Sequence, residues 1–250
     1  MKKKYLKILS IVLIVIAGYL YLAHTYIYRR IGYAHLPATD DRHTYVCEAA
    51  GASSTAEIVY AALGDSLTAG VGVDQYEKSY PYLLAQHLVR DDRRVVHKNF
   101  SYPGARTQNL IDDLLEPAIA EQPDVVTVLI GTNDIHGLVS VLEFEKNYDR
   151  ILEALTTRTD AQVYAVSIPR IGSDSLFWPP YNYYFDYKVV EFNAVIKKMA
   201  DRHGVRFIDL DTPTAAVLKT DGPHYSVDLF HPSSVGCEWW AKLIYDNIDQ

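Results

Sequence analysis

Ser66, Asp228 and His231 are the side chains best suited to nucleophilic chemistry in this chain. Ser66 lies within the run Gly64–Leu67, and His231 follows Asp228 by three positions. At this separation within one loop, a carboxylate can meet the imidazole N–H, fix its tautomer and stabilise the imidazolium that forms. A serine that acts with such a pair indicates acyl transfer through a covalent intermediate.

Two further residues can stabilise the negative oxygen that develops during acyl transfer. Gly104 follows a β-prone run, and a glycine there lets a backbone N–H approach a substrate without a side chain in the way. Asn133 follows another such run, and its amide can donate a hydrogen bond to an oxyanion. Taken singly, each of these residues is more often a turn former. Taken together, they supply a nucleophile, a base, an orienting carboxylate and oxyanion donors.

Short β-prone runs must position these residues. The runs cover residues 58–63, 95–100, 125–130, 163–168 and 205–210, and stretches with helical periodicity lie between them. Strands that alternate with helices predict a three-layer α/β/α domain with a five-stranded parallel sheet covered on both faces. Reactive loops follow the carboxyl ends of parallel strands, so we expect the site residues to meet at one edge of the sheet.

The segments that carry these residues resemble the blocks of a known family, the GDSL/SGNH hydrolases. Gly64–Leu67 is similar to the GDSL block, Gly104 to the glycine block, Gly131–Asp134 to the G-x-N-D block and Asp228–His231 to the D-x-x-H block. The blocks occur in the family's order, from about Val59 to the C-terminus. The resemblance implies a flavodoxin-like SGNH hydrolase domain and a serine esterase of the small, single-domain, lipase-like kind.

The resemblance also implies a role for each site residue. Ser66 would be the nucleophile, His231 the base and Asp228 the residue behind it. The Ser66 N–H, the Gly104 N–H and the Asn133 amide would form the oxyanion hole. The implied reaction is a two-step hydrolysis of a carboxylic ester or thioester, which needs no metal and no organic cofactor.

The charge and hydropathy pattern of residues 1–30 predicts a membrane anchor. Lysines at positions 2, 3, 4 and 7 precede an uncharged run from Ile8 to Tyr28, which ends at Arg29 and Arg30. As a helix this run measures roughly 30 Å, enough to cross a bilayer. A cleaved signal peptide is the alternative, but its apolar core usually has about 7 to 15 residues and ends in a small-x-small site. We therefore predict an anchor over residues 1–30, a linker over 31–56 and the hydrolase domain over 57–250.

Charge predicts the topology and disfavours nucleic acid as a partner. More positive charge lies before the apolar run than after it, so the positive-inside rule places the N-terminus in the cytoplasm and the domain outside. The formal net charge is −7, and every acidic residue follows Arg30. Such a negative domain repels phosphate backbones. We predict a single-pass protein of the cell membrane that contacts the bilayer through residues 8–28, with secretion after signal cleavage as the alternative.

Cys47 and Cys237 are the only cysteines. An external compartment would permit one disulfide, and about ten extended residues reach about 33 Å, far enough to bring Cys47 back beside the loop of His231. Closing so long a loop would stabilise the fold by about 4 to 5 kcal/mol in the chain-entropy model. Two unpaired thiols are the alternative that we keep open.

The segment 177–187, which we expect to be a loop at the active-site end, bears on the substrate. It contains seven aromatic residues and follows the fourth predicted strand. Such a loop can wall an acyl pocket, stack on sugar rings, dip into the membrane interface or merely cap the domain. The anchor and the similarity of Gly64–Leu84 to the small lipase-like members of the family favour lipid or lysophospholipid-type esters, whereas the outward location and this aromatic segment favour a polysaccharide substrate. An envelope polysaccharide O-acetyl esterase is the alternative, and a catalytically inactive binding protein is a third hypothesis; the sequence predicts no oligomeric state.

Overall fold

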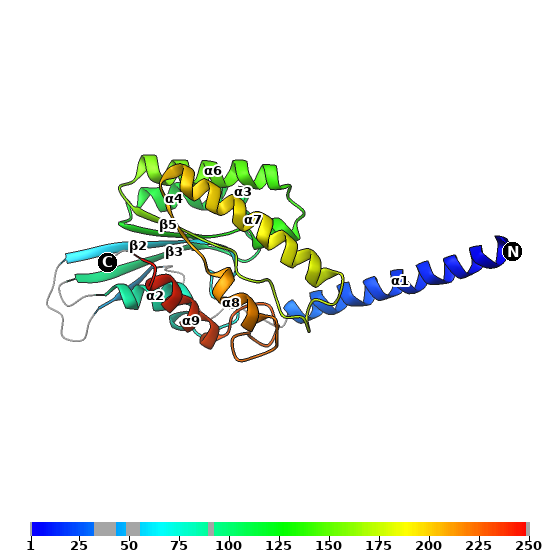
Figure 1. Ribbon diagram of the computed structural model, residues 1–250. Helices are drawn as coiled ribbons and strands as arrows, with labels where there is room; N and C mark the ends of the chain where they lie inside the picture. The colour runs from blue at the N-terminus through cyan, green and yellow to red at the C-terminus, as the bar shows by residue number, and fades with distance from the viewer. Residues whose placement is uncertain (1, 33–43, 49–55, 90–92, 249–250) are drawn as a thin grey trace.

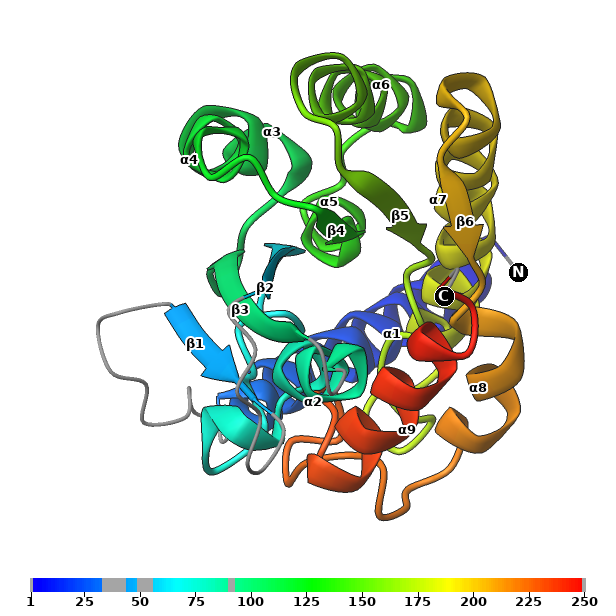
Figure 2. The same ribbon diagram turned by 90° about the vertical axis from the view of Figure 1, so that its left-hand side faces the viewer.

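The computed structural model describes residues 2–32, 44–48, 56–89 and 93–248. These residues form an α/β domain from which one long helix extends as an arm (Figure 1). The sheet lies between two layers of helices, which confirms the predicted three-layer architecture (Figure 2).

Within these described ranges, six strands form the sheet, in the order β1-β3-β2-β4-β5-β6. The predicted strands are present as β2 (Ala56–Gly64), β3 (Arg93–Ser101), β4 (Val125–Leu129), β5 (Gln162–Val166) and β6 (Arg206–Ile208). All neighbouring pairs among them are parallel. The central strand β4 is buried along its whole length, as expected for a parallel sheet that is covered on both faces.

A further strand, β1 (Thr44–Cys47), pairs antiparallel with β3 at the edge of the sheet. The prediction of five parallel strands is therefore wrong at this edge, and the sheet is mixed. β1 lies inside the range 31–56, which we predicted to be a linker. It is only four residues long, so its strand conformation depends on hydrogen bonding and packing with β3 more than on the β-propensity of its own residues.

Helices cover both faces of the sheet (Figure 2). One face carries α2 (Tyr80–Leu88) and α9 (Ser234–Tyr245). The other face carries α4 (Leu115–Ala120), α6 (Val141–Arg158) and α7 (Tyr181–His203). Short helical segments lie in the connections: a 3₁₀ turn (Tyr76–Lys78), α3 (Thr107–Asn109), a π-helical turn (Leu110–Leu114), α5 (Thr132–His136) and α8 (Asp211–Leu218).

Two apolar cores form because side chains point alternately to the two faces of each strand. In β2, Ala61 and Leu63 face the core beneath α6 and α7, whereas Tyr60 and Ala62 face the core beneath α2 and α9. The strand is thus packed from both sides, and the position at which it ends is fixed by both cores.

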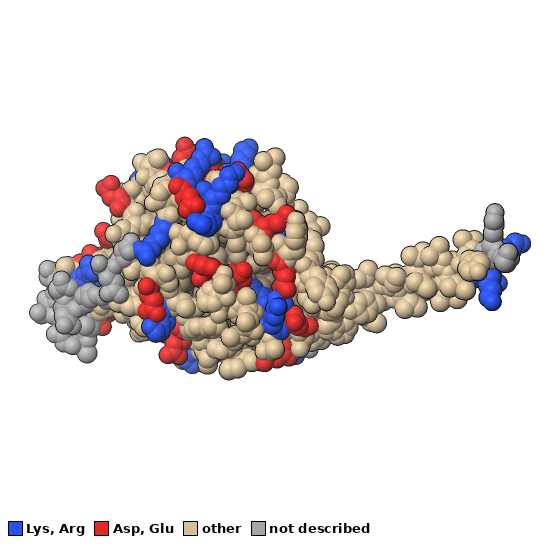
Figure 3. All heavy atoms as spheres, in the orientation of Figure 1, with Lys and Arg blue, Asp and Glu red and all other residues tan. Residues whose placement is uncertain are grey.

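The arm is α1 (Lys2–Ile31), a continuous helix. Figure 3 shows an uncharged shaft between the lysines at its tip and the domain. Its length and hydropathy are sufficient to cross a membrane, and a signal sequence meets the same criteria. Its last turns pack on the domain, where Ala23 and Ile27 are buried.

Cys47 in β1 and Cys237 in α9 are unpaired and buried in the same core. The disulfide that we considered from the sequence is therefore not formed, and the alternative of two thiols is the one that the structure shows. Burial raises the pKa of Cys47 to about 11 and that of Cys237 to about 12. Neither side chain is a thiolate at neutral pH.

We expect both thiols to be unreactive in the folded protein, because the thiolate is the reactive form and burial disfavours it. Titration with dithionitrobenzoate in the absence of reductant should show almost no reaction in native buffer, and two thiols per chain in guanidinium, one each from Cys47 and Cys237. Absence of reaction in guanidinium would reveal a disulfide, and rapid reaction in native buffer would contradict the burial.

Candidate active site

Strand β2 ends at Gly64 and leads directly into the turn that carries Ser66. A Cβ atom at Gly64 would lie 2.1 Å from Thr68 Oγ1 and 2.5 Å from the Leu129 carbonyl oxygen. Glycine at this position therefore lets the chain turn tightly out of the sheet beside β4. Ser66 sits in this turn and is 6% exposed.

A continuous chain of hydrogen bonds joins Ser66, His231 and Asp228. Ser66 Oγ lies 2.9 Å from His231 Nε2, and His231 Nδ1 lies 2.5 Å from Asp228 Oδ2. His231 is 5% exposed and Asp228 is fully buried. The fold thus brings together the three residues that the sequence selected, although Ser66 and His231 are 165 positions apart.

The loop around Asp228 satisfies the other oxygen of its carboxylate. Oδ1 accepts the Phe230 and His231 N–H groups at 3.0 Å each and the Ser226 hydroxyl at 2.6 Å. Burial alone would raise the pKa of Asp228, but the hydrogen bonds from this loop and the charge of His231 outweigh it and lower the pKa below its usual value. Asp228 is therefore an ionised acceptor that holds the imidazole in one orientation.

Gly104 and Asn133 lie in the loops that follow β3 and β4. Gly104 has a φ of +85°, which residues with a side chain rarely adopt. Asn133 Nδ2 donates to the Ala105 carbonyl oxygen at 3.1 Å, so the amide is fixed against the loop of Gly104. An amide nitrogen carries two hydrogens, and one is left for a second acceptor.

The register of the sheet brings these loops to the turn of Ser66. Gly64 at the end of β2 is paired with Ser101 of β3 on one side and with Leu129 of β4 on the other. Ser66, Gly104 and Asn133 therefore follow three neighbouring strands at one edge of the sheet. A buried serine, an imidazole paired with a carboxylate, and amide donors, all at the carboxyl ends of the strands, can perform nucleophilic acyl transfer.

Residues 62–239 match the model of the GDSL-like lipase/acylhydrolase family. The chain belongs to this family. The hydrolase is 30% identical to the spore germination lipase LipC of Bacillus licheniformis over 202 residues, which cover 74% of this chain and 93% of that one. It is 28% identical to an acetylxylan esterase of Xylanibacter ruminicola over 209 residues, which cover 74% of this chain and 42% of that one.

Solved structures share the fold of the hydrolase. An extracellular lipase of Streptomyces rimosus has a TM-score of 0.58 at 21% identity, covering 76% of the hydrolase and 100% of that chain. A variant of Axe2, an acetyl-xylooligosaccharide esterase of a Geobacillus species, has a TM-score of 0.62 at 21% identity, with coverages of 79% and 95%. Membership of the family shows that the hydrolase acts on ester bonds.

Asp134 ties the loop of Asn133 to the loop of Gly104, a contact that sequence reasoning did not identify. Its carboxylate accepts the Thr107 N–H at 3.0 Å and the Thr107 hydroxyl at 2.5 Å. Asn147 of α6 donates to the same hydroxyl oxygen at 3.2 Å. The only signal in the sequence was the place of Asp134 at the end of the G-x-N-D segment.

His136, for which we predicted no role, lies two positions after Asp134 and next to the site. Its ring centroid is 5.5 Å from that of Phe230, whose ring is 4.7 Å from that of His231. Burial, and to a smaller extent the charge of His231, lowers the pKa of His136 to about 4, so the ring is neutral at pH 7. Its buried Nε2 has no hydrogen-bond partner among the residues that the structure describes.

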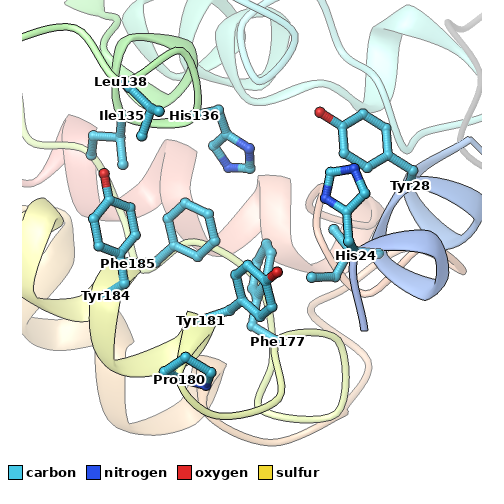
Figure 4. Close-up of a pocket in the computed structure, with 11 residues that line it drawn as sticks. His24, Tyr28, Ile135, His136, Leu138, Phe177, Pro180, Tyr181, Tyr184 and Phe185 are labelled. Carbon is cyan, nitrogen blue, oxygen red and sulfur yellow. The ribbon is translucent and has the colours of Figure 1, made fainter. Parts of the chain in front are cut away.

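His136 also lines a pocket of about 530 Å³ (Figure 4). Three parts of the chain supply its walls: α1 through Ile27 and Tyr28, α5 through His136, and the segment 177–187 through Phe177 and Phe185. This segment is a loop only in its first part, because α7 begins at Tyr181. The expectation of a loop through residue 187 is therefore wrong, and most of the aromatic side chains project from a helix.

Asp65, which precedes Ser66 in the sequence, is another buried carboxylate of the site. Its Oδ1 accepts the Leu67 N–H at 3.0 Å, and its Oδ2 has no partner among the described residues. Burial raises the pKa of Asp65 to about 7. The hydrogen bond from Leu67 lowers this pKa and the nearby charge of Asp134 raises it, but both effects are smaller than that of burial.

We expect Asp65→Asn to change how stability depends on pH. The folded-state pKa of Asp65 lies above its unfolded value of 3.8. The stabilisation that accompanies its protonation is therefore complete below pH 3.8 and is lost as the pH rises through 7. Asparagine does not titrate, so the variant does not lose this stabilisation as the pH rises. The free energy of unfolding of the variant minus that of the wild type should therefore be roughly 2–4 kcal/mol larger at pH 8 than at pH 4. Urea denaturation at the two pH values measures this, and an equal difference at both would contradict the raised pKa.

Proposed function

We propose that the hydrolase is a serine esterase that works through an acyl-enzyme, with Ser66 as nucleophile, His231 as general base and Asp228 as the orienting carboxylate. The observation that carries this proposal is the hydrogen-bonded chain from Ser66 Oγ through His231 to Asp228, with links of 2.9 and 2.5 Å. All three side chains are buried, so the chain is held in place by packing as well as by its hydrogen bonds.

In the first step His231 Nε2 takes the proton of Ser66, and Ser66 Oγ attacks the ester carbonyl carbon. The negative oxygen of the tetrahedral intermediate is held by the Ser66 N–H, the Gly104 N–H and the remaining N–H of the Asn133 amide. The C–O bond to the alcohol breaks, and the alcohol leaves with the proton from His231. Water then attacks the acyl-enzyme in the same way and releases the acid, which restores Ser66.

The pocket beside the site favours lipid or lysophospholipid-type substrates. Its walls are largely aromatic and aliphatic, and its volume of about 530 Å³ is that of a small-molecule site. A second candidate is removal of O-acetyl groups from an envelope polysaccharide, which the similarity to an acetylxylan esterase supports. We also propose that α1 is an uncleaved single-pass anchor with the domain outside the cytoplasm, supported by the lysines at its tip and its uncharged shaft.

Replacement of the three residues tests the mechanism. We expect Ser66→Ala and His231→Ala each to lower kcat by about 10⁶, and Asp228→Ala by about 10⁴, because the orienting residue is partly replaceable. Hydrolysis of p-nitrophenyl esters by the full chain in detergent measures these values. Ser175→Ala, which removes an exposed hydroxyl, is the matched control and should keep wild-type activity. Full activity in Ser66→Ala would exclude the mechanism.

Acyl chain length separates the candidate substrates. We expect kcat/KM to rise from acetate to longer acyl esters, because each buried methylene contributes about 0.8 kcal/mol in an apolar pocket. An optimum at acetate would favour polysaccharide deacetylation instead. Absence of hydrolysis at every length would leave a binding protein as the better hypothesis.

A further inference from the structure

The anchor helix is part of the domain, and not merely a tether. The Tyr19 hydroxyl donates to the Pro179 carbonyl oxygen at 2.7 Å. The ring of Trp178 stacks against Tyr19 at 6.2 Å and against Tyr26 at 5.2 Å between centroids. On the inner side of the same turns, Ile27 belongs to the core beneath α6 and α7. The second half of α1 therefore lies along the aromatic end of α7, by which we mean residues 177–187, the segment that leads into this helix together with its first turns.

This docking determines how close the domain sits to the membrane. The uncharged run begins at Ile8, and contact with the domain begins at Tyr19. Residues 8–18 measure about 16 Å as a helix, roughly half of a hydrocarbon core about 30 Å thick. The helix can complete the crossing only if its docked half is also in the bilayer, and the aromatic end of α7 must then enter the leaflet with it.

The surface around this end suits such a position. Side chains that project from it include Leu138 (75% exposed), Tyr183 (68%) and Tyr184 (36%). Aromatic residues of this kind concentrate where the hydrocarbon meets the headgroups. The first charged residues of α7 form ion pairs: Asp186 with Arg170 at 2.6 Å, and Lys188 with Glu191 at 2.7 Å. These pairs mark the level at which the helix leaves the apolar layer.

The pocket lies between the two inserted elements. His24, Ile27 and Tyr28 of α1 form one wall, and Phe177 and Phe185 form the facing wall (Figure 4). His136 also lines the pocket, and the ring of Phe230 contacts both His136 and His231. The pocket therefore lies between the membrane-facing side of the molecule and the proposed catalytic residues, with the ring of Phe230 separating its lining residue His136 from His231.

We propose that this pocket binds the acyl chain of an ester that resides in the bilayer, that it opens into the leaflet, and that the anchor helix forms one of its walls. This inference rests on the proposed esterase function and narrows its substrate class to long-chain esters presented by the membrane. The anchor then completes the binding site, in addition to holding the enzyme at the membrane.

The depth of the aromatic end can be measured by fluorescence quenching. The full chain is reconstituted in vesicles of phosphatidylcholine with brominated acyl chains, and its tryptophan emission is compared with that in unbrominated vesicles. Trp178 should be quenched because it lies against α1, whereas Trp239 and Trp240 belong to α9. Trp178→Phe should therefore lose most of the quenching, and equal quenching in the variant and the wild type would overturn the insertion.

The wall formed by α1 can be tested by narrowing the pocket from that side. Full-length enzyme is reconstituted in vesicles of ether-linked phosphatidylcholine, which has no ester to hydrolyse, and kcat/KM is measured for p-nitrophenyl laurate and acetate. His24→Trp places a larger ring in the pocket, and loss of room for about two methylenes should lower the laurate-to-acetate ratio about tenfold. Leu22→Trp, on the same helix but outside the pocket and 63% exposed, should keep the wild-type ratio.

The outcomes distinguish this inference from the proposed function. An unchanged ratio in His24→Trp, or an equal fall in both variants, would overturn the wall formed by α1. A wild-type enzyme that hydrolyses acetate but not laurate would overturn the acyl pocket and leave the esterase mechanism intact. If the wild type hydrolyses neither ester, the proposed function itself fails. A fall of about tenfold in His24→Trp alone would support the inference.

Discussion

The hydrogen bond between the Asp228 carboxylate and the His231 imidazole is the contact on which the site depends. It places an ionised group where water cannot reach it, and a buried carboxylate stays ionised only when donors surround it. Two backbone N–H groups and the Ser226 hydroxyl provide those donors to Oδ1. The loop reaches this geometry with Leu229 at a φ of +62°, an unusual value for a residue with a branched side chain. The orientation of the imidazole, and with it the contact to Ser66, follows from this loop.

The sheet sets the second constraint, because its parallel strands bring their ends to one edge. The tight turn at Gly64 requires close contact with β4, and the loops after β3 and β4 are tied by Asp134 and Thr107. The anchor helix reaches the molecule near the start of α7 (Figure 1). The aromatic start of α7 thus contacts the anchor on one side and lines the pocket beside His136 on the other.

The fold and the central residues could be predicted because both depend on local patterns. Each strand after residue 56 is a β-prone run, and each site residue follows the end of a strand or sits in a short motif. We did not predict β1, because four residues are too few to show the alternation of apolar and polar side chains that identifies a strand in the sequence. We predicted no role for His136, because a histidine that follows a turn does not indicate a site by itself. Its position next to the site is evident only from its packing against Phe185 and Phe230. Apolar residues of the anchor fit a lipid environment and a protein core equally well, so the burial of Ala23 and Ile27 could not be foreseen.

The packing of Ala23 and Ile27 against the domain has a consequence for biosynthesis. In the proposed single-pass topology, the N-terminal helix is made first and enters the bilayer before the residues that cover it emerge from the ribosome. The core beneath α6 and α7 can close only after α7 has been synthesised and has met α1, as the contact between Tyr181 and Leu20, 161 positions apart, illustrates. In that topology the final packing of the enzyme takes place at the membrane surface, and a chain that lost this helix during export would have to shield Phe177, Trp178 and Phe185 from water in another way.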